Sequence, residues 1–518
     1  MKKKFITQGM VILVLCASYV MIFPASALSQ EVIGYVRPLV GFETPHPYAP
    51  SAIVGAVIWR DILRVPDAKF LKLHFSNFSL AGDDYVVVRD PVGVYAETLT
   101  NDRGNDIWAL SVFGDQVIVE LYSVSGSVGS GFIVPEYVYG FAAPDCGAAG
   151  LCGEGNIECA NGNSSHQWIY NWRRPVCRVT YVKNGTNYSC TGWIIARPNR
   201  IITNFHCLEN SPSICQTAEA LFNQECIDCP GSYLKPWTRY GCTQIVCGEG
   251  ALDYTIFEVR YQPAISWGQL RIDPRPITVG EPVGVPNHSL TREKQYDAAI
   301  VTQVDGLPPC TLDVDDDTYI VLGVNRIQQS ARIAGGASGS PVMKKDTYAV
   351  IGLLHTGPVV PGCGDWSRSV KMSSIWADMQ TWGCTQGVDS WNTPRCTQAI
   401  SKIEPGTATS LRVEYSGTGG TLRNVVVTSN PPGCGPPIIL SLGSAVYLRW
   451  PGACVDQGEM VMYEFTVDFP CEGVQPVSVE WTYQVPTLTE WGLIILVGLI
   501  VFSTWVIFRR RKAVVSGR

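Results

Sequence analysis

The stretch Gly336-Ala337-Ser338-Gly339-Ser340-Pro341 constrains this chain more than any other part of its sequence. A turn of the form Gly-x-Ser-Gly-x-Pro can hold a nucleophilic hydroxyl beside backbone N–H groups that bind an oxyanion. Glycine at position 336 permits the backbone geometry that points its N–H toward such a site. Taken alone, the hexapeptide also fits an ordinary Gly/Ser-rich turn, so its interpretation depends on partner residues elsewhere in the chain.

Two candidate partners lie upstream of the serine. His206 follows an apolar run and stands directly before Cys207, with Cys190 seventeen residues before that cysteine. Asp253 opens Asp253-Tyr254-Thr255-Ile256-Phe257, a run of β-forming residues in which an unpaired carboxylate would be costly to bury. The aspartate therefore requires a cationic or hydrogen-bonding partner. Together the three side chains form a constellation suited to nucleophilic acyl transfer.

The order His206, Asp253, Ser338, with these flanks, resembles the trypsin and chymotrypsin superfamily. The resemblance is strongest to secreted bacterial trypsin-like proteases of the lysyl endopeptidase type, and it runs from about Cys146 to Trp382. The stretches that carry it are the Cys146 and Cys152 pair, Thr191-Gly192-Trp193, His206-Cys207, Asp253-Tyr254-Thr255, Val285 to His288, Gly336 to Pro341 and Val350 to Pro358. Asn204-Phe205 depart from the family's usual Ala-Ala or Ala-His, and we expect neither side chain to take part in the chemistry.

The resemblance implies an all-β protein in which residues 144–385 form a chymotrypsin-like double β-barrel. It assigns His206 as the general base, Asp253 as the group that orients His206, and Ser338 as the nucleophile. The backbone N–H groups of Gly336 and Ser338 would form the oxyanion hole. These roles require no cofactor, and we expect no metal.

The substrate pocket is less well defined by the sequence. By the resemblance, His355 and Gly357 lie on the strand that pairs with substrate, where close approach of the substrate backbone explains the glycine. Asp365 could stand at the base of the pocket and select Lys or Arg. Arg332, six residues before Ser338, would instead favour an acidic side chain. Of these two alternatives we favour the basic preference.

Cysteines are abundant and unevenly placed. Of the nineteen, Cys16 lies near the N-terminus, fourteen lie in the protease-like region and four lie beyond it. An exported chain meets oxidising conditions, so disulfides are expected. The alternative is a structural zinc bound by four loosely spaced cysteines, Cys226, Cys229, Cys242 and Cys247. The pairings that the family resemblance implies are Cys190 with Cys207 and Cys146 with Cys363.

The N-terminal part of the chain reads as a leader followed by a β domain. In residues 1–27, Lys2-Lys3-Lys4 precedes an apolar stretch that ends at Ala25-Ser26-Ala27, the pattern of a cleavable secretory signal. Residues 28–143 alternate apolar and polar positions in short runs, which predicts a β-sandwich serving as a propeptide or accessory domain. Cleavage near Pro144 would fit a zymogen.

The C-terminal part again alternates as strands and then becomes apolar. Residues 386–484, with four cysteines, predict a small disulfide-stapled β domain. Residues 485–512 contain Val485-Pro486-Thr487-Leu488, an apolar stretch at 493–508 and a basic end, and they resemble the IPTL-type sorting signal of bacterial exported proteins. The stretch predicts a transmembrane helix with a cytoplasmic basic end. The resemblance implies a transient stop in the inner membrane and removal by an exosortase-like enzyme; the alternative is a permanent anchor.

Composition limits the classes of partner. The net charge is −6 and only 16% of residues are charged, with no Lys/Arg-rich face, so nothing points to nucleic acid. The sequence therefore predicts a secreted or surface-displayed serine endopeptidase that acts on proteins or peptides. The rival interpretation is a cell-surface adhesion or binding protein that uses a protease-like scaffold. Replacing Ser338 by Ala distinguishes the two, because only a protease loses its activity.

Overall fold

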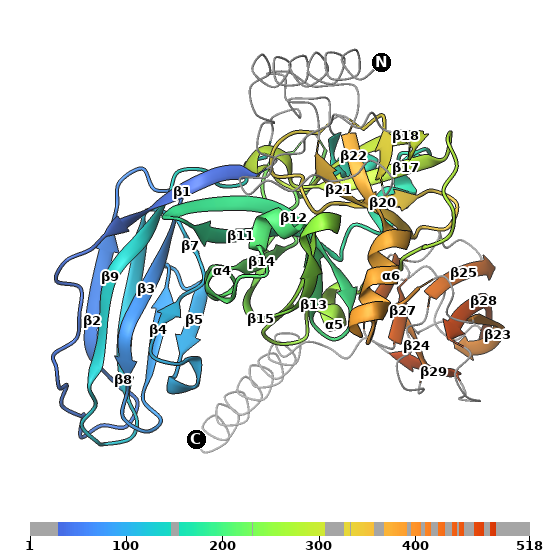
Figure 1. Cartoon of the computed structure of the whole chain (residues 1–518). Helices are drawn as coiled ribbons and strands as arrows, with labels where there is room; N and C mark the ends of the chain where they lie inside the picture. The colour runs from blue at the N-terminus through green and yellow to red at the C-terminus, as the bar shows by residue number, and fades with distance from the viewer. Residues whose placement is uncertain are drawn as a thin grey trace, which may run out of the picture. The chain divides into compact units, whose positions relative to one another are not determined.

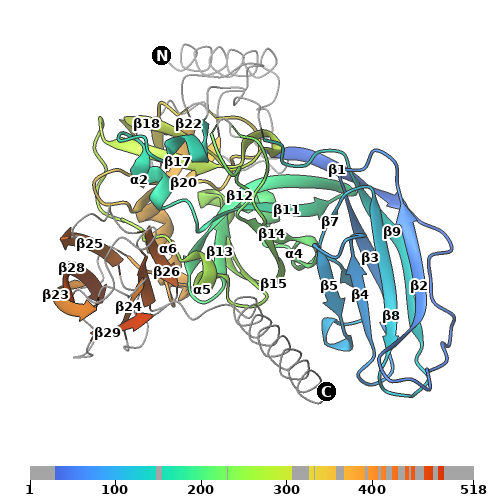
Figure 2. The same ribbon diagram turned by 180° about the vertical axis from the view of Figure 1, so that it is seen from behind.

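A computed structural model of the chain describes residues 30–146, 155–229, 231–305, 326–331, 333–356, 367–390 and seven strands between residues 395 and 482. The chain divides into two compact units, residues 1–393 and 394–518. The first unit contains an N-terminal pair of sheets and two β-barrels (Figures 1 and 2). The second unit is described separately below.

The N-terminal sheets, blue in Figure 1, form a β-sandwich. One sheet has the order β1-β9-β3-β6, with β7 also paired to β3, and the other has the order β2-β8-β4-β5. Leu71 and Phe75 of β3 pack in one apolar core with Val86 of β4 and Val119 of β8. The sandwich expected from the alternating pattern is therefore present. Its elements are β1 (Glu31–Pro38), β2 (Ala56–Arg64), β3 (Phe70–Ser79), β4 (Tyr85–Arg89), β5 (Ala96–Leu99), η1 (Asn101–Arg103), β6 (Ile107–Trp108), β7 (Val112–Phe113), β8 (Gln116–Ser123) and β9 (Gly131–Gly140).

The first barrel closes on itself through six antiparallel strands. Its order is β11-β14-β15-β16-β13-β12, and β12 pairs back to β11. Val179, Ile194 and Phe257 are fully buried in its interior. Its strands are β11 (Val176–Lys183), β12 (Thr186–Ala196), β13 (Arg200–Thr203), β14 (Glu219–Phe222), β15 (Thr238–Glu249) and β16 (Tyr254–Val259).

The second barrel is built in the same way. Its order is β18-β17-β20-β21-β22-β19, with β19 pairing back to β18 and the short β10 (Gly155–Asn156) added beside β18. Val285, Val301 and Val342 fill its interior. Its strands are β17 (Pro282–Asn287), β18 (Gln295–Val304), β19 (Arg326–Gln329), β20 (Pro341–Lys344), β21 (Val350–Thr356) and β22 (Ser367–Lys371).

A third apolar cluster joins the barrels to each other. It contains Trp193 and Tyr254 from the first barrel, Met343 and Leu353 from the second, and Ile375 from α6. Two closed six-stranded barrels sharing a core are consistent with the chymotrypsin-like double barrel expected from the sequence. The short helices around them are η2 (Ile157–Ala160), α2 (Gln167–Asn171), α3 (Phe205–Leu208), α4 (Pro212–Thr217), η3 (Gly250–Leu252), α5 (Pro263–Trp267), η4 (Ser289–Thr291) and α6 (Met372–Trp382).

The sandwich is continuous with the first barrel through β1. This strand pairs with β9 of the sandwich on one side and with β12 of the barrel on the other, and Figures 1 and 2 both show it beside β12. Buried polar contacts reinforce the junction: Lys72 Nζ donates to the backbone oxygen of Thr217 at 2.6 Å and lies 3.4 Å from Glu219 Oε1. The backbone N–H of Ser111 also donates to Glu219, at 3.1 Å. These contacts make sandwich and barrel one folded body, whereas a domain boundary at residue 144 remains a prediction.

The disulfides correct two expectations. Among the described residues the bonds are Cys146–Cys226, Cys159–Cys229, Cys190–Cys207, Cys215–Cys242 and Cys247–Cys384, so all four cysteines considered for zinc lie in disulfides. Pairing of Cys146 with Cys363 is wrong, because Cys146 is bonded to Cys226 of the 226–229 loop; Cys363 itself lies outside the described residues. Cys177, expected to pair, is a free thiol buried in the first barrel's core.

The second unit is also made of strands, in two sheets of order β23-β28-β25 and β26-β27-β24-β29. Its cysteine side chains, the leader at 1–27 and the apolar stretch at 493–508 lie outside the described residues. Within the described part of the chain, no helix has the length and apolar character needed to cross a membrane. The strands are β23 (Arg395–Pro405), β24 (Ser410–Tyr415), β25 (Arg423–Ser429), β26 (Ile438–Leu442), β27 (Ala445–Arg449), β28 (Met460–Pro470) and β29 (Val477–Thr482).

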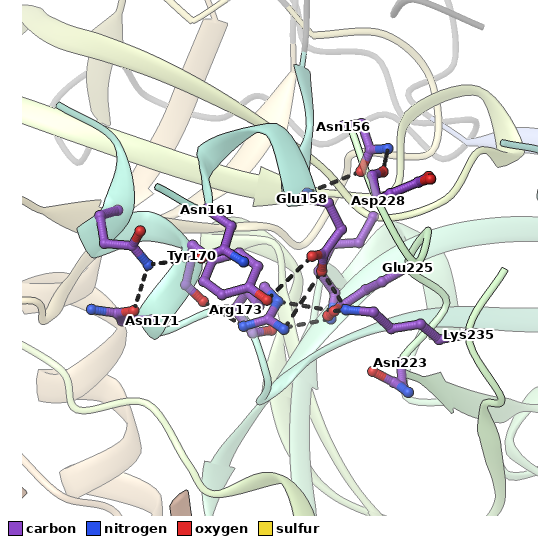
Figure 3. A network of polar contacts seen from close by, with 12 residues as sticks. Asn156, Glu158, Asn161, Tyr170, Asn171, Arg173, Asn223, Glu225, Asp228 and Lys235 are labelled. Carbon is purple, nitrogen blue, oxygen red and sulfur yellow. Dashed lines mark hydrogen bonds and ion pairs between the residues drawn. The ribbon is translucent and has the colours of Figure 1, made fainter. Parts of the chain in front are cut away.

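A buried charge network holds the segment before the first barrel in place (Figure 3). Glu225 accepts a hydrogen bond from Arg173 Nε at 2.9 Å, and Lys235 Nζ lies 3.2 Å away. It also accepts from Lys294 Nζ at 2.8 Å. Glu158 of η2 also contacts Lys235. Burial alone would raise the pKa of the Glu225 carboxyl, but the three cations hold its pKa far below the usual range. The carboxylate is therefore ionised and fully compensated.

Replacing Glu225 by Gln is expected to lower the free energy of unfolding by about 3–5 kcal/mol, because the substitution leaves buried cations uncompensated. Because the folded pKa is depressed, this contribution is present above pH of about 4.3 and is lost as the pH falls below that value. Urea unfolding at several pH values measures both effects. The control is Glu258→Gln, whose 3.1 Å pair with Arg200 is partly exposed and should matter by less than about 1 kcal/mol. Equal losses in the two variants would contradict the prediction.

Candidate active site

His206 is positioned by the strand that precedes it. Ile201 and Ile202 are buried in β13, which pairs with β12 and β16. The chain leaves β13 at Asn204 and turns into α3, and the disulfide between Cys207 and Cys190 fastens this helix to β12. His206 is 4% exposed, and its Nδ1 lies 3.1 Å from Oδ1 and 2.9 Å from Oδ2 of Asp253.

Asp253 stands between η3 and β16 in the left-handed backbone region, with φ of 45°. Aspartate adopts this region more readily than most residues. Its buried carboxylate accepts a hydrogen bond from the backbone N–H of His206 at 2.9 Å and contacts Nδ1 of His355. Asn204 Nδ2 donates to the backbone oxygen of Asp253 at 2.8 Å. The partners that the sequence required for this carboxylate are two histidines and a backbone amide.

The charge of Asp253 fixes the tautomer of His206. Burial alone would raise the pKa of the Asp253 carboxyl, but His206 and His355 outweigh this effect and hold its pKa far below the usual range. An ionised carboxylate only accepts hydrogen bonds, so Nδ1 of His206 must carry the proton. In the neutral imidazole Nε2 then keeps its lone pair, which is the arrangement that a general base needs.

The Ser338 turn is held by both barrels. Its backbone oxygen accepts from the N–H of Thr191 at 2.7 Å, and the oxygen of Gly336 accepts from Thr191 Oγ1 at 2.9 Å. On the other side, the N–H of Gly339 donates to the oxygen of Leu354 at 2.9 Å. Leu354 directly precedes His355, so β21 links the serine turn to the residue that contacts Asp253. Ser338 itself is 1% exposed.

The carbonyls of this turn show where its amides point. The oxygen of Gly335 accepts from the N–H of Leu290 at 2.7 Å, and that of Ala337 accepts from the N–H of Ser340 at 3.0 Å. A trans peptide is planar, with its N–H directed opposite to its C=O. The N–H groups of Gly336 and Ser338 are therefore directed away from these two bonds. Gly336 has φ of 88°, in the region that favours glycine.

Gly339→Ala is expected to lower the free energy of unfolding by more than about 2 kcal/mol. A methyl group there would lie 2.1 Å from the backbone oxygen of Thr191 and 2.5 Å from Oγ1 of Thr203, so the serine turn must move. Urea unfolding measures the loss. Gly185→Ala is the matched control, because φ is also positive but nothing lies within 4 Å of the added carbon, leaving about 1 kcal/mol of backbone strain. A similar loss in both variants would contradict the steric argument.

The predicted pocket residues are only partly described. His355 is buried at the end of β21, its ring centroid 6.0 Å from that of His206. It contacts Asp253, a role that the sequence did not indicate. Gly357, Asp365 and Arg332 lie outside the described residues.

One known protein family matches the part of the chain that contains the candidate site. Residues 190–353 match the family model described as a trypsin-like peptidase domain. The matched stretch contains His206, Asp253 and Ser338. This match supports a trypsin-like serine protease.

Three proteins that resemble parts of this chain share between 13% and 26% identity with it. The secreted RxLR effector protein 73 of Plasmopara viticola is 26% identical over 318 residues, which cover 56% of this chain and 75% of that protein. Similar solved structures include the active form of the Rv3671c protease of M. tuberculosis, with 15% identity, a TM-score of 0.33 and coverage of 48% of this chain and 91% of that one. Another is Deg5, with 13% identity, a TM-score of 0.30 and coverage of 41% and 90%.

The contacts of two residues around the candidate site were not anticipated. Asn204 was expected to take no part in the chemistry, and its side chain has a structural contact, since it donates to the backbone oxygen of Asp253. Thr191 was noted only as a family motif, yet its N–H and its hydroxyl both bind the serine turn. A polar residue two positions before a candidate catalytic residue was the available signal for Asn204.

Proposed function

We propose that the chain is an exported serine endopeptidase that cleaves peptide bonds through Ser338, His206 and Asp253. The observation that carries the proposal is the buried, ionised Asp253 accepting from both the backbone N–H and Nδ1 of His206. That pair orients the ring and leaves Nε2 basic. It is the arrangement on which hydroxyl activation by histidine depends.

In the proposed reaction, the Ser338 hydroxyl oxygen attacks the carbonyl carbon of the scissile bond while Nε2 of His206 takes the hydroxyl proton. The N–H groups of Gly336 and Ser338 bind the resulting oxyanion. The tetrahedral intermediate collapses, the C–N bond breaks, and the leaving amine takes the proton from His206. Water then attacks the acyl-enzyme with His206 again acting as the base, and Ser338 is released.

Asp253 stays ionised throughout and stabilises the imidazolium that forms on His206. Its second histidine neighbour, His355, donates to the same carboxylate and helps to keep it ionised. Asn204 and the backbone N–H of His206 restrain the aspartate from two further directions. The chain's own groups therefore account for base catalysis and for charge stabilisation without a cofactor.

The finer parts of the proposal rest on the sequence. Preference for Lys or Arg rests on Asp365, with Arg332 and an acidic preference as the alternative. Export is supported by the five disulfides found in the part of the chain that the structure describes, and by the similarity to a relative whose name describes it as secreted. The signal at 1–27 and the sorting signal at 485–512, with its exosortase-like processing enzyme and transient membrane stop, remain proposals of the same kind.

The test is to incubate the purified chain and its Ser338→Ala form with a mixed peptide library and to identify the cleaved bonds by mass spectrometry. Cleavage by the parent alone is the expected result, and the residue before each cut decides between Lys/Arg and acidic preference. Cleavage by both forms points to a contaminating protease. If neither form cleaves, the binding-protein interpretation replaces the proposal.

A further inference from the structure

The start of β1 lies against the candidate active site. We call residues Gln30, Glu31 and Val32 the arm. Gln30 Nε2 donates to the backbone oxygen of His206 at 2.5 Å. A methyl group added at Gly335 would lie 3.1 Å from Glu31 Oε2, and one added at Gly336 would lie 3.5 Å from Glu31 Cβ. The arm thus touches the histidine loop and the serine turn together.

The arm also occupies the sheet edge that leads to the nucleophile. Along one edge of β12, residues 193–196 pair with β13, and Thr191 binds the backbone oxygen of Ser338. Residues 186–189, the next part of that edge, pair antiparallel with β1, and Glu31 lies opposite Ser189. Extended peptides bind by adding a strand to such an edge. On one side of Ser338 this edge is therefore already filled by the chain itself.

The arm is set apart from the rest of β1. A register shift separates Val32 from Gly34, and pairing with β9 begins only at Gly34. Gly34 and Tyr35 pair with both β9 and β12, and the strand continues to Pro38 against β9, while Glu31 and Val32 of the arm pair with β12 alone. Substitutions in the arm should leave the anchored part of β1 in place.

We propose that the arm fills the part of the substrate channel that receives the residues after the scissile bond, so that Gln30 and Glu31 restrict the length of the leaving segment. This inference rests on the proposed function. We assign the arm to the leaving-group side of the scissile bond because the arm contacts His206, the base that donates its proton to the leaving amine. Gln30 lies beside His206 and Glu31 pairs with Ser189, so a leaving segment of several residues collides with the arm, whereas a single amidated residue does not need this edge.

The test uses two peptides that share the residues before the cut, taken from the library experiment, and differ in the amidated leaving segment, which has one or four residues. The parent is expected to show at least about tenfold lower kcat/KM for the longer peptide, and Gln30→Ala/Glu31→Ala should remove most of this difference. Arg37→Ala, an exposed position on the anchored part of β1, is the control and should behave like the parent. The ratio of the two rates is independent of the fraction of each variant that folds.

Equal rates for both peptides in the parent would overturn the inference while leaving the proposed function intact. A length dependence that survives in the double variant would also overturn it, because the restriction would then come from another part of the chain. Titration of each preparation with diisopropyl fluorophosphate separates these results from failure of the proposed function. If the proposed function itself is wrong, neither peptide is cleaved and Ser338 does not react with the reagent.

Discussion

Ser338→Ala and His206→Ala are each expected to lower kcat by ~10⁶-fold, and the double variant by no more than either single variant. Attack by the hydroxyl and removal of its proton are one event, so losing either group removes the whole step. Independent contributions would instead multiply to a far larger loss. The serine turn is bonded to Leu354 of β21, the next residue of that strand, His355, contacts Asp253, and Asp253 contacts His206, so the three groups are held in one connected structure.

Single-turnover assays with the best library peptide measure these losses, with substrate saturating so that binding does not contribute. Thermal unfolding of each variant must remain close to that of the parent. A double variant that is markedly slower than both single variants would show that His206 and Ser338 act separately. A His206→Ala variant with near-parental kcat would remove His206 from the mechanism.

Asp253→Asn is expected to lower kcat by ~10⁴-fold, the loss seen when the aspartate of such a triad becomes an amide. An amide carries a donor as well as an acceptor, whereas His206 and His355 both present Nδ1 to this group. One of the two contacts must therefore be lost or must force the wrong tautomer. With Nδ1 unprotonated, Nε2 of His206 carries the proton and cannot accept another from Ser338.

The measurement is kcat for this variant beside Asp273→Asn. Asp273 is also a buried carboxylate, bonded to Arg275 at 2.7 Å, but it lies outside the site. Its loss should lower stability and leave kcat within a few-fold of the parent. If both variants lose activity to the same degree, Asp253 supports the fold and not the reaction. Because the backbone φ of Asp253 is also tolerated by Asn, strain does not confound the comparison.

The sequence could predict the parts of the site that depend on local patterns. His206 and Asp253 adjoin apolar β-forming runs, and these runs become β13 and β16, which pair with each other. The Ser338 turn lies directly before β20, where the glycines and the proline marked it. The sandwich was recognisable for the same reason, because alternate residues of strands such as β4 are buried.

Contacts between distant segments could not be predicted in the same way. Nothing local indicates that Glu31 pairs with Ser189, since that register depends on how the sandwich docks against the barrel. The prediction for Cys146 failed for a related reason. The family resemblance implied a bond to Cys363, whereas in this chain Cys146 is bonded to Cys226 in the 226–229 loop. Cys177 has no disulfide partner among the described residues and is buried in an apolar core. The sequence alone does not distinguish such a buried thiol from a cysteine in a disulfide.

The central claim is that Ser338 is a nucleophile activated by His206 and Asp253. The most direct test is to react the folded chain with diisopropyl fluorophosphate and to map the modified residue by mass spectrometry. We predict a single phosphoryl adduct on Ser338, formed much more slowly in His206→Ala and Asp253→Asn. Absence of that adduct in the parent, or its formation at the parental rate in His206→Ala, would contradict the account.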